Sequence, residues 1–223
     1  LLFIGLAAAI PTINLNDQWV EYFDDRVEFR GDAKFAINHL TGLYILEYSV
    51  PAGESGAISE PKYLQDLDDF ANWLREYSKV RHVYSYTDII KRLSKNMHAD
   101  DPAYYKIPEE RELAAQYLLL YELSLPYGLD LNDRIDISKS STRVSVTLDE
   151  ITTGETRQFL KDIDAWWDAR SPGNEVYGTG ATYLFSFISE RNIQDMIGGN
   201  IVAVILISMI MMVALGSFSF GLL

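Results

Sequence analysis

The three histidines, His39, His82 and His98, are the first side chains to consider as metal ligands. Zinc sites draw on His and Cys side chains, and two histidines on one helix can share a metal when they are four residues apart. No pair has that spacing here, and the chain contains no cysteine. We therefore expect histidines that lie at the surface or form hydrogen bonds, and only a spatial cluster with carboxylates would favour zinc. The lack of cysteine also excludes structural disulfides.

A run of acidic and amide side chains at Asp130, Asn132, Asp133 and Asp136 offers the oxygen ligands with which a calcium-binding loop begins. Such a loop also needs a central glycine for its sharp turn and a glutamate at its far end. Neither follows at the required spacing. The sequence therefore predicts a solvated turn.

Two pairs of carboxylates are adjacent in sequence, Asp68 with Asp69 and Asp100 with Asp101. Adjacent side chains diverge on a helix, so we expect these pairs to solvate an exposed face. The glycines around Thr179 lack the third glycine of a dinucleotide-binding loop, and the chain has neither a Gly-x-Ser-x-Gly nor a Walker A sequence. The sequence predicts neither an enzyme nor a cofactor.

Residues 116–123 read Gln-Tyr-Leu-Leu-Leu-Tyr-Glu-Leu and are apolar around most of a helix. Such a helix contacts neighbours on more than one side. Two interpretations remain open: burial between a sheet and other helices, or a wall for a hydrophobic cargo. The residues that would line a cargo path are Tyr117, Leu118, Tyr121 and Leu125.

The elements that position these residues are marked by periodicity and by proline and glycine. Residues 43–50 are rich in β-forming side chains and predict a strand, and residues 80–86 predict its return. Between them, Pro61 suits the first turn of a helix. The apolar stripe of that helix has helical spacing and consists of Leu64, Leu67, Phe70, Ala71 and Leu74.

The centre of the chain predicts a short helix over residues 87–95 and a longer one that begins at Pro108. Proline and the three nearby glutamates suit a first turn. This helix should end near Leu123, before Pro126 and Gly128.

The second half repeats the pattern of strand, helix and strand. Residues 142–148 alternate apolar and polar, which predicts a half-buried strand. Thr152 and Glu155 fit a capping box, and Pro172-Gly173 should stop the helix that it begins. Residues 175–179 predict a short strand, which leads through Gly180 into a final helix.

Two such units in series predict an α+β fold of the ferredoxin-like, split βαβ kind. The expected core residues lie on the apolar faces of these elements: Leu67, Val144, Val146, Leu148, Phe159 and Ile163.

The two ends of the chain are apolar. Residues 196–223 contain no ionisable side chain and are long enough to span a bilayer, although a buried core helix is the alternative. Residues 1–10 are too short to span alone and read as the end of a truncated first transmembrane helix. The alternative is the apolar region of a secretory signal, whose usual Met and basic start are not seen here.

If both ends are transmembrane, residues 11–195 form one domain on one side of the membrane. The net charge of −13 is carried almost wholly by this domain. Because anionic cytoplasmic leaflets attract basic rather than acidic segments, we expect the domain to lie outside the cytoplasm. An acidic chain without a Lys/Arg cluster also argues against nucleic acid as a partner.

Several segments together resemble one family of exporters. The most specific is residues 112–131, reading Glu-Leu-Ala-Ala-Gln-Tyr-Leu-Leu-Leu-Tyr-Glu-Leu-Ser-Leu-Pro-Tyr-Gly-Leu-Asp-Leu. The others are Asn16-Asp17 with Tyr22-Phe23, Phe29-Arg30-Gly31-Asp32, residues 60–64, residues 80–91, Gly178-Thr179-Gly180 and residues 215–221. They resemble the RND (resistance, nodulation, division) superfamily, in particular its MMPL-like, single-component branch. One departure is that a basic residue commonly stands where this chain has Gly216 or Ser219.

The resemblance implies the first extracytoplasmic porter domain of a multi-pass, proton-driven exporter in the inner (cytoplasmic) membrane. Its partners would be the lipid bilayer, the remaining transmembrane helices, a second porter domain, and a hydrophobic small molecule or lipid as cargo. The proton-coupling residues would lie outside this chain, and a homo-oligomer stays open.

Two other classes of function can be compared with an exporter. An extracytoplasmic sensor or binding domain between two membrane helices would signal by helix displacement and needs no cargo path. A membrane-anchored hydrolase would need a nucleophile and base, for which the sequence has no signature.

Overall fold

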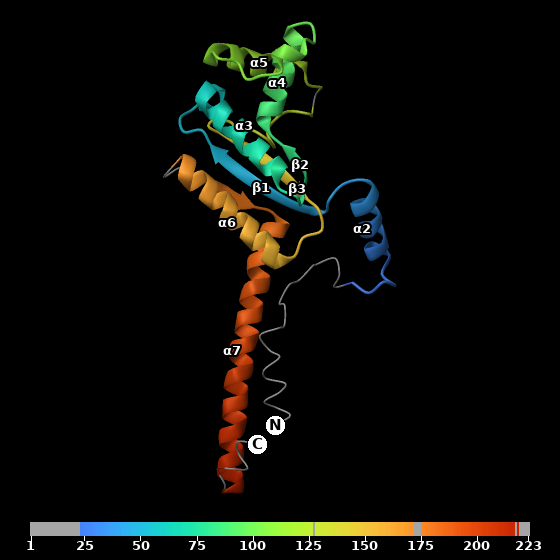
Figure 1. Cartoon of the computed structure of the whole chain (residues 1–223), viewed down its shortest axis with the longest axis vertical. Coiled ribbons are helices and arrows are strands. Elements are labelled where there is room, and N and C mark those ends of the chain that lie inside the picture. Colours follow the sequence, from blue (N-terminus) through green and yellow to red (C-terminus); the bar gives the residue numbers. More distant parts are fainter. Residues whose placement is uncertain (1–22, 127, 172–174, 217, 219–223) are drawn as a thin grey trace.

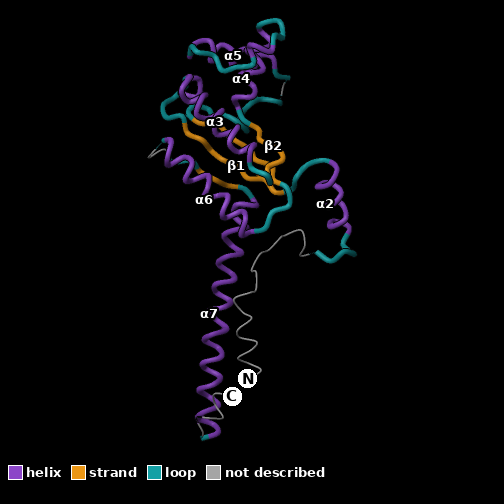
Figure 2. The backbone as a smooth tube through the Cα atoms, viewed as in Figure 1, coloured by secondary structure: helices purple, strands orange, loops and turns teal. Residues whose placement is uncertain are grey.

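The structure, a computed structural model, describes residues 23–126, 128–171, 175–216 and 218. Its centre is a four-stranded antiparallel sheet made of β1 (Tyr44–Pro51), β2 (Val80–Tyr84), β3 (Ser141–Leu148) and β4 (Tyr177–Thr179). The spatial order is β2-β3-β1-β4 (Figures 1 and 2). Because β3 pairs antiparallel with both β1 and β2, those two strands run parallel to each other with β3 inserted between them.

Two helices, α3 (Pro61–Glu76) and α6 (Thr153–Arg170), form a layer against the sheet. The rings of Phe70 on α3 and Trp167 on α6 lie 5.0 Å apart, so the two helices are neighbours. The strands alternate buried and accessible residues, as a sheet with one covered face requires. The predicted α+β class is thereby confirmed. All six predicted core residues are fully buried: Leu67, Val144, Val146, Leu148, Phe159 and Ile163.

Local signals in the sequence account for the helix starts. Pro61 occupies the first turn of α3, and Thr152 and Glu155 form the predicted capping box of α6. The predicted start at Pro108 is wrong, since α5 runs over Arg111–Ser124. Pro108 is buried. The chain is therefore fixed against the core there before the helix begins.

The segment between β2 and β3, residues 85–140, is an insertion that carries two helices. These are α4 (Tyr86–Met97) and α5, with a short 3-10 helix, η4 (Pro102–Tyr104), between them. A second 3-10 turn, η3 (Ala57–Ser59), precedes α3. The insertion lies at the end of the molecule opposite the long helix α7 (Figure 1). Helix α2 (Glu28–His39) precedes the sheet, was not predicted, and buries Ala33 and Ile37.

Helix α7 (Ala181–Leu215) is the final described element and follows β4 directly. Gly180 joins them at φ +108, and added side-chain bulk there would meet the Ile45 carbonyl oxygen at 3.1 Å, so this turn requires glycine. The first turns of α7 contact α6 and β1, and Arg157 donates to the Ser186 carbonyl at 3.0 Å. The predicted helix after Gly180 is confirmed.

Beyond those first turns α7 leaves the domain (Figure 1). Among the described residues it alone is long and apolar enough to cross a membrane, by length and composition, and its apolar stretch is not buried against the rest of the molecule. At 1.5 Å per residue it is roughly 50 Å long, more than a bilayer core of about 30 Å. This is compatible with membrane association. The predicted first transmembrane segment, residues 1–10, lies outside the described residues.

Candidate functional site

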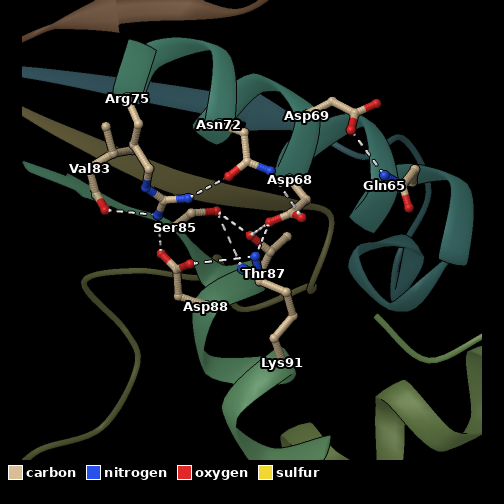
Figure 3. A network of polar contacts seen from close by, with 10 residues as sticks. All are labelled: Gln65, Asp68, Asp69, Asn72, Arg75, Val83, Ser85, Thr87, Asp88 and Lys91. Atoms are coloured by element: carbon tan, nitrogen blue, oxygen red, sulfur yellow. Dashed lines mark hydrogen bonds and ion pairs between the residues drawn. The ribbon is translucent and has the colours of Figure 1, made fainter. Parts of the chain in front are cut away.

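A network of charged side chains joins α3 to the start of α4 (Figure 3). The buried Asp68 carboxylate accepts from the Lys91 ammonium at 2.5 Å and from the Thr87 hydroxyl at 3.1 Å. Thr87 in turn shares a hydrogen bond of 2.9 Å with Ser85, whose hydroxyl caps α4. A buried carboxylate needs such partners, because water no longer solvates it.

A second ion pair extends the network toward the surface. The guanidinium of Arg75 donates to the Asp88 carboxylate at 2.6 Å, to the Val83 carbonyl at 3.2 Å and to the Asn72 side chain at 2.9 Å (Figure 3). The Val83 carbonyl belongs to β2, an edge strand of the sheet. Arg75 therefore fixes α3, β2 and α4 relative to one another.

The network corrects one expectation from the sequence. Asp68 and Asp69 do diverge, but Asp68 is buried rather than solvated. It lies on the apolar stripe of α3, one residue after Leu67 and four after Leu64. A polar side chain on such a stripe predicts a buried partner, and this was the signal that could have revealed it. Its partner Lys91 is 23 residues further along the chain.

The network forms part of the wall of a cleft of about 630 Å³ between β2 and the insertion. Strand β2, helices α3, α4 and α5, and the link after η4 all contribute. Its polar lining includes Asn72, Arg75, Asp88, Lys91, Arg92 and His82. Its apolar and aromatic lining includes Tyr84, Ile89, Leu93, Tyr105 and Tyr121. A concave site with apolar walls and a few convergent polar groups is the usual form of a small-molecule site.

The four residues predicted for a cargo path are not brought together. Tyr117 and Leu118 are buried in the core. Tyr121 lines the cleft, whereas Leu125 lines a separate cavity of about 280 Å³ beside the loop that precedes β3. Sequence analysis therefore found one residue of the cleft, Tyr121, and missed the charged residues of α3 and α4.

Helix α5 packs against α4 and η3 through one face. Its inner face buries Ala114, Tyr117 and Leu118 in the core, but the main contacts of the helix are with α4 and η3 rather than with the sheet that the first interpretation expected. Its outer face exposes Leu119, Leu120 and Leu123, the last at 76%. The predicted contact on more than one side is thus not made within the described residues.

The histidines do not form a metal site in the described part of the chain, where no group of three or more His, Asp or Glu side chains could hold an ion. His98 stacks on Tyr104 with ring centroids 3.7 Å apart, and His39 lies against Phe35. His82 lines the cleft. The expectation of surface or hydrogen-bonded histidines agrees with these positions.

The acidic run after α5 is the predicted turn, and Asp136 organises it. Its carboxylate accepts from the backbone N–H groups of Ser140 and Ser141, each at 2.6 Å, and from the Ser138 hydroxyl. Burial alone would raise the pKa of Asp136, but these hydrogen bonds outweigh it and hold the pKa well below its ordinary value. The carboxylate therefore closes the loop that returns the chain to β3.

The chain matches no model of a known protein family, and a comparison with curated proteins finds no similar one. The geometry of the cleft is therefore the main guide to function. The cleft offers cations, hydrogen-bond donors and aromatic walls, which suit non-covalent binding.

Proposed function

We propose that this chain is an extracytoplasmic porter domain of a membrane exporter for hydrophobic or amphiphilic molecules. The observation that carries the proposal is the direct passage from the sheet into α7. Strand β4 ends at Thr179, and α7 begins at Ala181 and continues as one helix to Leu215. A domain so connected cannot rotate at β4 without moving the helix.

The sheet supports the same proposal. Its element order, with the insertion set aside, is strand, helix, strand, strand, helix, strand, and its spatial order is β2-β3-β1-β4. We assign it to the ferredoxin-like, split βαβ kind, in which each crossover leaves room for a strand of the other unit. This is the fold that the resemblance to RND exporters implies.

Helix α7 is proposed to cross the bilayer with its apolar part. Its last ionisable residue is Asp195, and most of the side chains that follow are apolar and exposed, including Ile201, Ile205 and Met209. Such a surface is costly in water and favourable in lipid. The ionisable residues at the start of α7 have partners. Glu190 pairs with Arg157 of α6 at 3.7 Å, and Arg191 pairs with Asp195 within the helix.

Topology provides the first test. The chain lacks cysteine, so Glu54→Cys and Asp133→Cys each introduce one accessible thiol. Both should react with a membrane-impermeant maleimide on intact spheroplasts. Ser59→Cys, at a buried position, is the matched control and should react only after denaturation. Labelling of the two exposed sites only after lysis would place the domain in the cytoplasm and refute the proposal.

Export is tested in energised cells that express the full-length gene product and are preloaded with Nile red, an uncharged apolar dye. We expect faster loss of dye than from cells without the protein, and slower loss with Tyr121→Glu, since Tyr121 lines the cleft. Leu123→Glu changes an exposed residue of the same helix outside that cleft and is the control. Equal efflux for Tyr121→Glu and the parent would remove this residue from the cargo path.

The passage from β4 to α7 also suits a second candidate, the extracytoplasmic sensor. A ligand that shifts the sheet would move α7 by the same rigid connection. Dye efflux no faster than in cells without the protein, combined with outside labelling, would favour the sensor over the exporter.

A further inference from the structure

The cleft beside β2 differs in charge from the rest of the molecule. Two of its cations are balanced, Arg75 by Asp88 at 2.6 Å and Lys91 by Asp68 at 2.5 Å. Arg92, on the rim, forms no side-chain ion pair or hydrogen bond with the described residues. The cleft therefore carries one uncompensated cation, in a chain whose net charge is −13.

The remaining lining of the cleft is largely apolar and aromatic. Tyr105 lies with its ring 5.2 Å below the Lys91 ammonium, and Tyr84 stacks under the Arg134 guanidinium at 4.3 Å. Ile89 and Leu93 continue the apolar surface along α4 toward Tyr121. A volume of about 630 Å³ lies within the ordinary range of small-molecule sites.

The polar groups of the cleft are fixed before any ligand arrives. Arg75 is held by Asn72, Val83 and Asp88, and the buried Lys91 is held by Asp68 of α3. Side chains that are already ordered lose little conformational entropy on binding. Arg92 is the exception, because it is exposed and free to turn toward a ligand.

We propose that this cleft binds an amphipathic anion, a molecule with an aromatic or branched apolar body and one sulfonate, carboxylate or phosphate group. The body lies between Tyr84, Tyr105 and Tyr121, and the anionic group meets Arg92. This inference rests on the proposed function and deepens it, because it adds a preference for an anionic group among the hydrophobic or amphiphilic molecules that the domain handles. Its test measures binding alone, so its failure is distinguishable from a failure of topology or export.

The test uses the whole chain in phosphatidylcholine nanodiscs and isothermal titration calorimetry, with empty nanodiscs subtracted. Three probes separate the two requirements: 2-naphthalenesulfonate has both the body and the charge, 2-naphthalenemethanol has only the body, and methanesulfonate has only the charge. We expect 2-naphthalenesulfonate to bind about tenfold more tightly than either of the others. Only this probe combines a charge-assisted hydrogen bond to Arg92 with burial of the naphthyl ring. Equal affinity for the charged and uncharged naphthyl probes would overturn the proposal.

Variants locate the site. Arg92→Gln should weaken binding of 2-naphthalenesulfonate about tenfold and leave that of 2-naphthalenemethanol unchanged. Lys95→Gln removes one positive charge from the same helix but outside the cleft lining, and should change neither by more than about twofold. Tyr121→Ala should weaken both naphthyl probes. If Arg92→Gln and Lys95→Gln have equal effects, the attraction is only long-range charge and the assigned site is wrong, whether or not Tyr121→Ala folds.

Discussion

The sandwich of sheet, α3 and α6 is held together differently from the insertion between β2 and β3. In the sandwich, apolar side chains such as Leu46, Val146 and Phe159 are completely buried. The insertion is attached where it leaves the sheet by the Asp68–Lys91 pair, and where it returns by the hydrogen bonds of Asp136. Burial of apolar side chains stabilises the fold but depends little on their orientation. The hydrogen bonds of these carboxylates do depend on orientation, so they fix the path of the chain where it leaves the sheet and where it returns.

The insertion has fewer buried apolar side chains than the sandwich, so the polar anchors matter more to its placement. Helix α5 buries only Ala114, Tyr117 and Leu118 among its described residues, while Leu119 and Leu123 are exposed. The helix also contacts α4 and η3 but not the sheet to any large extent. An arrangement of this kind leaves a cleft beside the edge strand that a fully packed layer would have filled.

The largest effect is expected from a charge in the sandwich. Val146→Asp should prevent stable folding of the chain, because an unpaired carboxylate at a fully buried position costs several kcal/mol of a total stability of about 5 to 15 kcal/mol. Thr147→Asp, on the opposite face of the same strand, is the matched control and should fold. Circular dichroism in detergent during thermal unfolding measures both. A cooperative transition for Val146→Asp at the parent temperature would contradict the assignment of the core.

The apolar sandwich was largely predictable from the sequence, and the reason is local. Alternation along β3 and the stripe on α3 each report burial within one element, and the capping box of α6 is complete within four residues. These patterns do not depend on what the element packs against. The α+β class follows from their order.

The cleft was not predictable, because its walls come from distant parts of the chain. Asp68 and Lys91 are 23 residues apart, and Arg75 and Asp88 are 13 apart. Adjacent acidic residues looked like a solvated face, and only the position of Asp68 on an apolar stripe indicated otherwise. The sequence predicts Tyr121 as a lining residue only from the apolar character of its helix, and Tyr117, which is predicted on the same ground, is part of the core.

The second prediction concerns the Asp68–Lys91 pair, which attaches the insertion to α3. Lys91→Met should lower the free energy of unfolding by about 3 to 5 kcal/mol, because it leaves the buried Asp68 carboxylate without its cation. The double variant Asp68→Leu with Lys91→Met should recover most of that loss, since neither charge is then buried. Chemical denaturation of the chain in detergent compares the three proteins. If the double variant is as unstable as Lys91→Met, the ion pair stabilises the fold itself and does not only neutralise two buried charges.

The third prediction concerns the return of the insertion and depends on pH. The folded pKa of Asp136 is depressed by its hydrogen bonds, so its contribution is complete above the unfolded pKa of about 4 and is lost as the pH falls toward the folded pKa. We expect a loss of about 1 to 2 kcal/mol over that window from this group, less than the lowered pKa alone would give, because solvent screens a carboxylate that is partly exposed. Asp136→Asn should flatten the dependence of the melting temperature on pH there. Glu155→Gln is the comparison, because Glu155 also has a lowered pKa but its hydrogen bonds cap α6 in the sandwich. The two variants compare the acid response of the loop with that of the sandwich. If Asp136→Asn leaves the slope of melting temperature against pH unchanged, Asp136 does not contribute to the loss of stability in acid.

The smallest effect distinguishes polar groups that have partners from those that do not. Tyr63, on α3, donates from its hydroxyl to the Val50 carbonyl at 3.0 Å and shares a hydrogen bond of 2.6 Å with Thr142. The hydroxyl of Tyr86, the first residue of α4, is buried without a hydrogen-bond partner in the described part of the chain, and burial raises its pKa.

Removing a satisfied hydroxyl costs about 1 kcal/mol, whereas removing an unsatisfied one relieves the desolvation penalty that it carries. Tyr63→Phe should therefore destabilise the protein and Tyr86→Phe should stabilise it by about 1 kcal/mol. Opposite signs in parallel denaturant titrations would show that buried hydroxyls stabilise this fold only where they have partners, and that the Tyr86 hydroxyl does not help to attach the insertion. If Tyr86→Phe is as destabilising as Tyr63→Phe, the Tyr86 hydroxyl has a partner and the entry to the insertion is more fully bonded than the described contacts indicate.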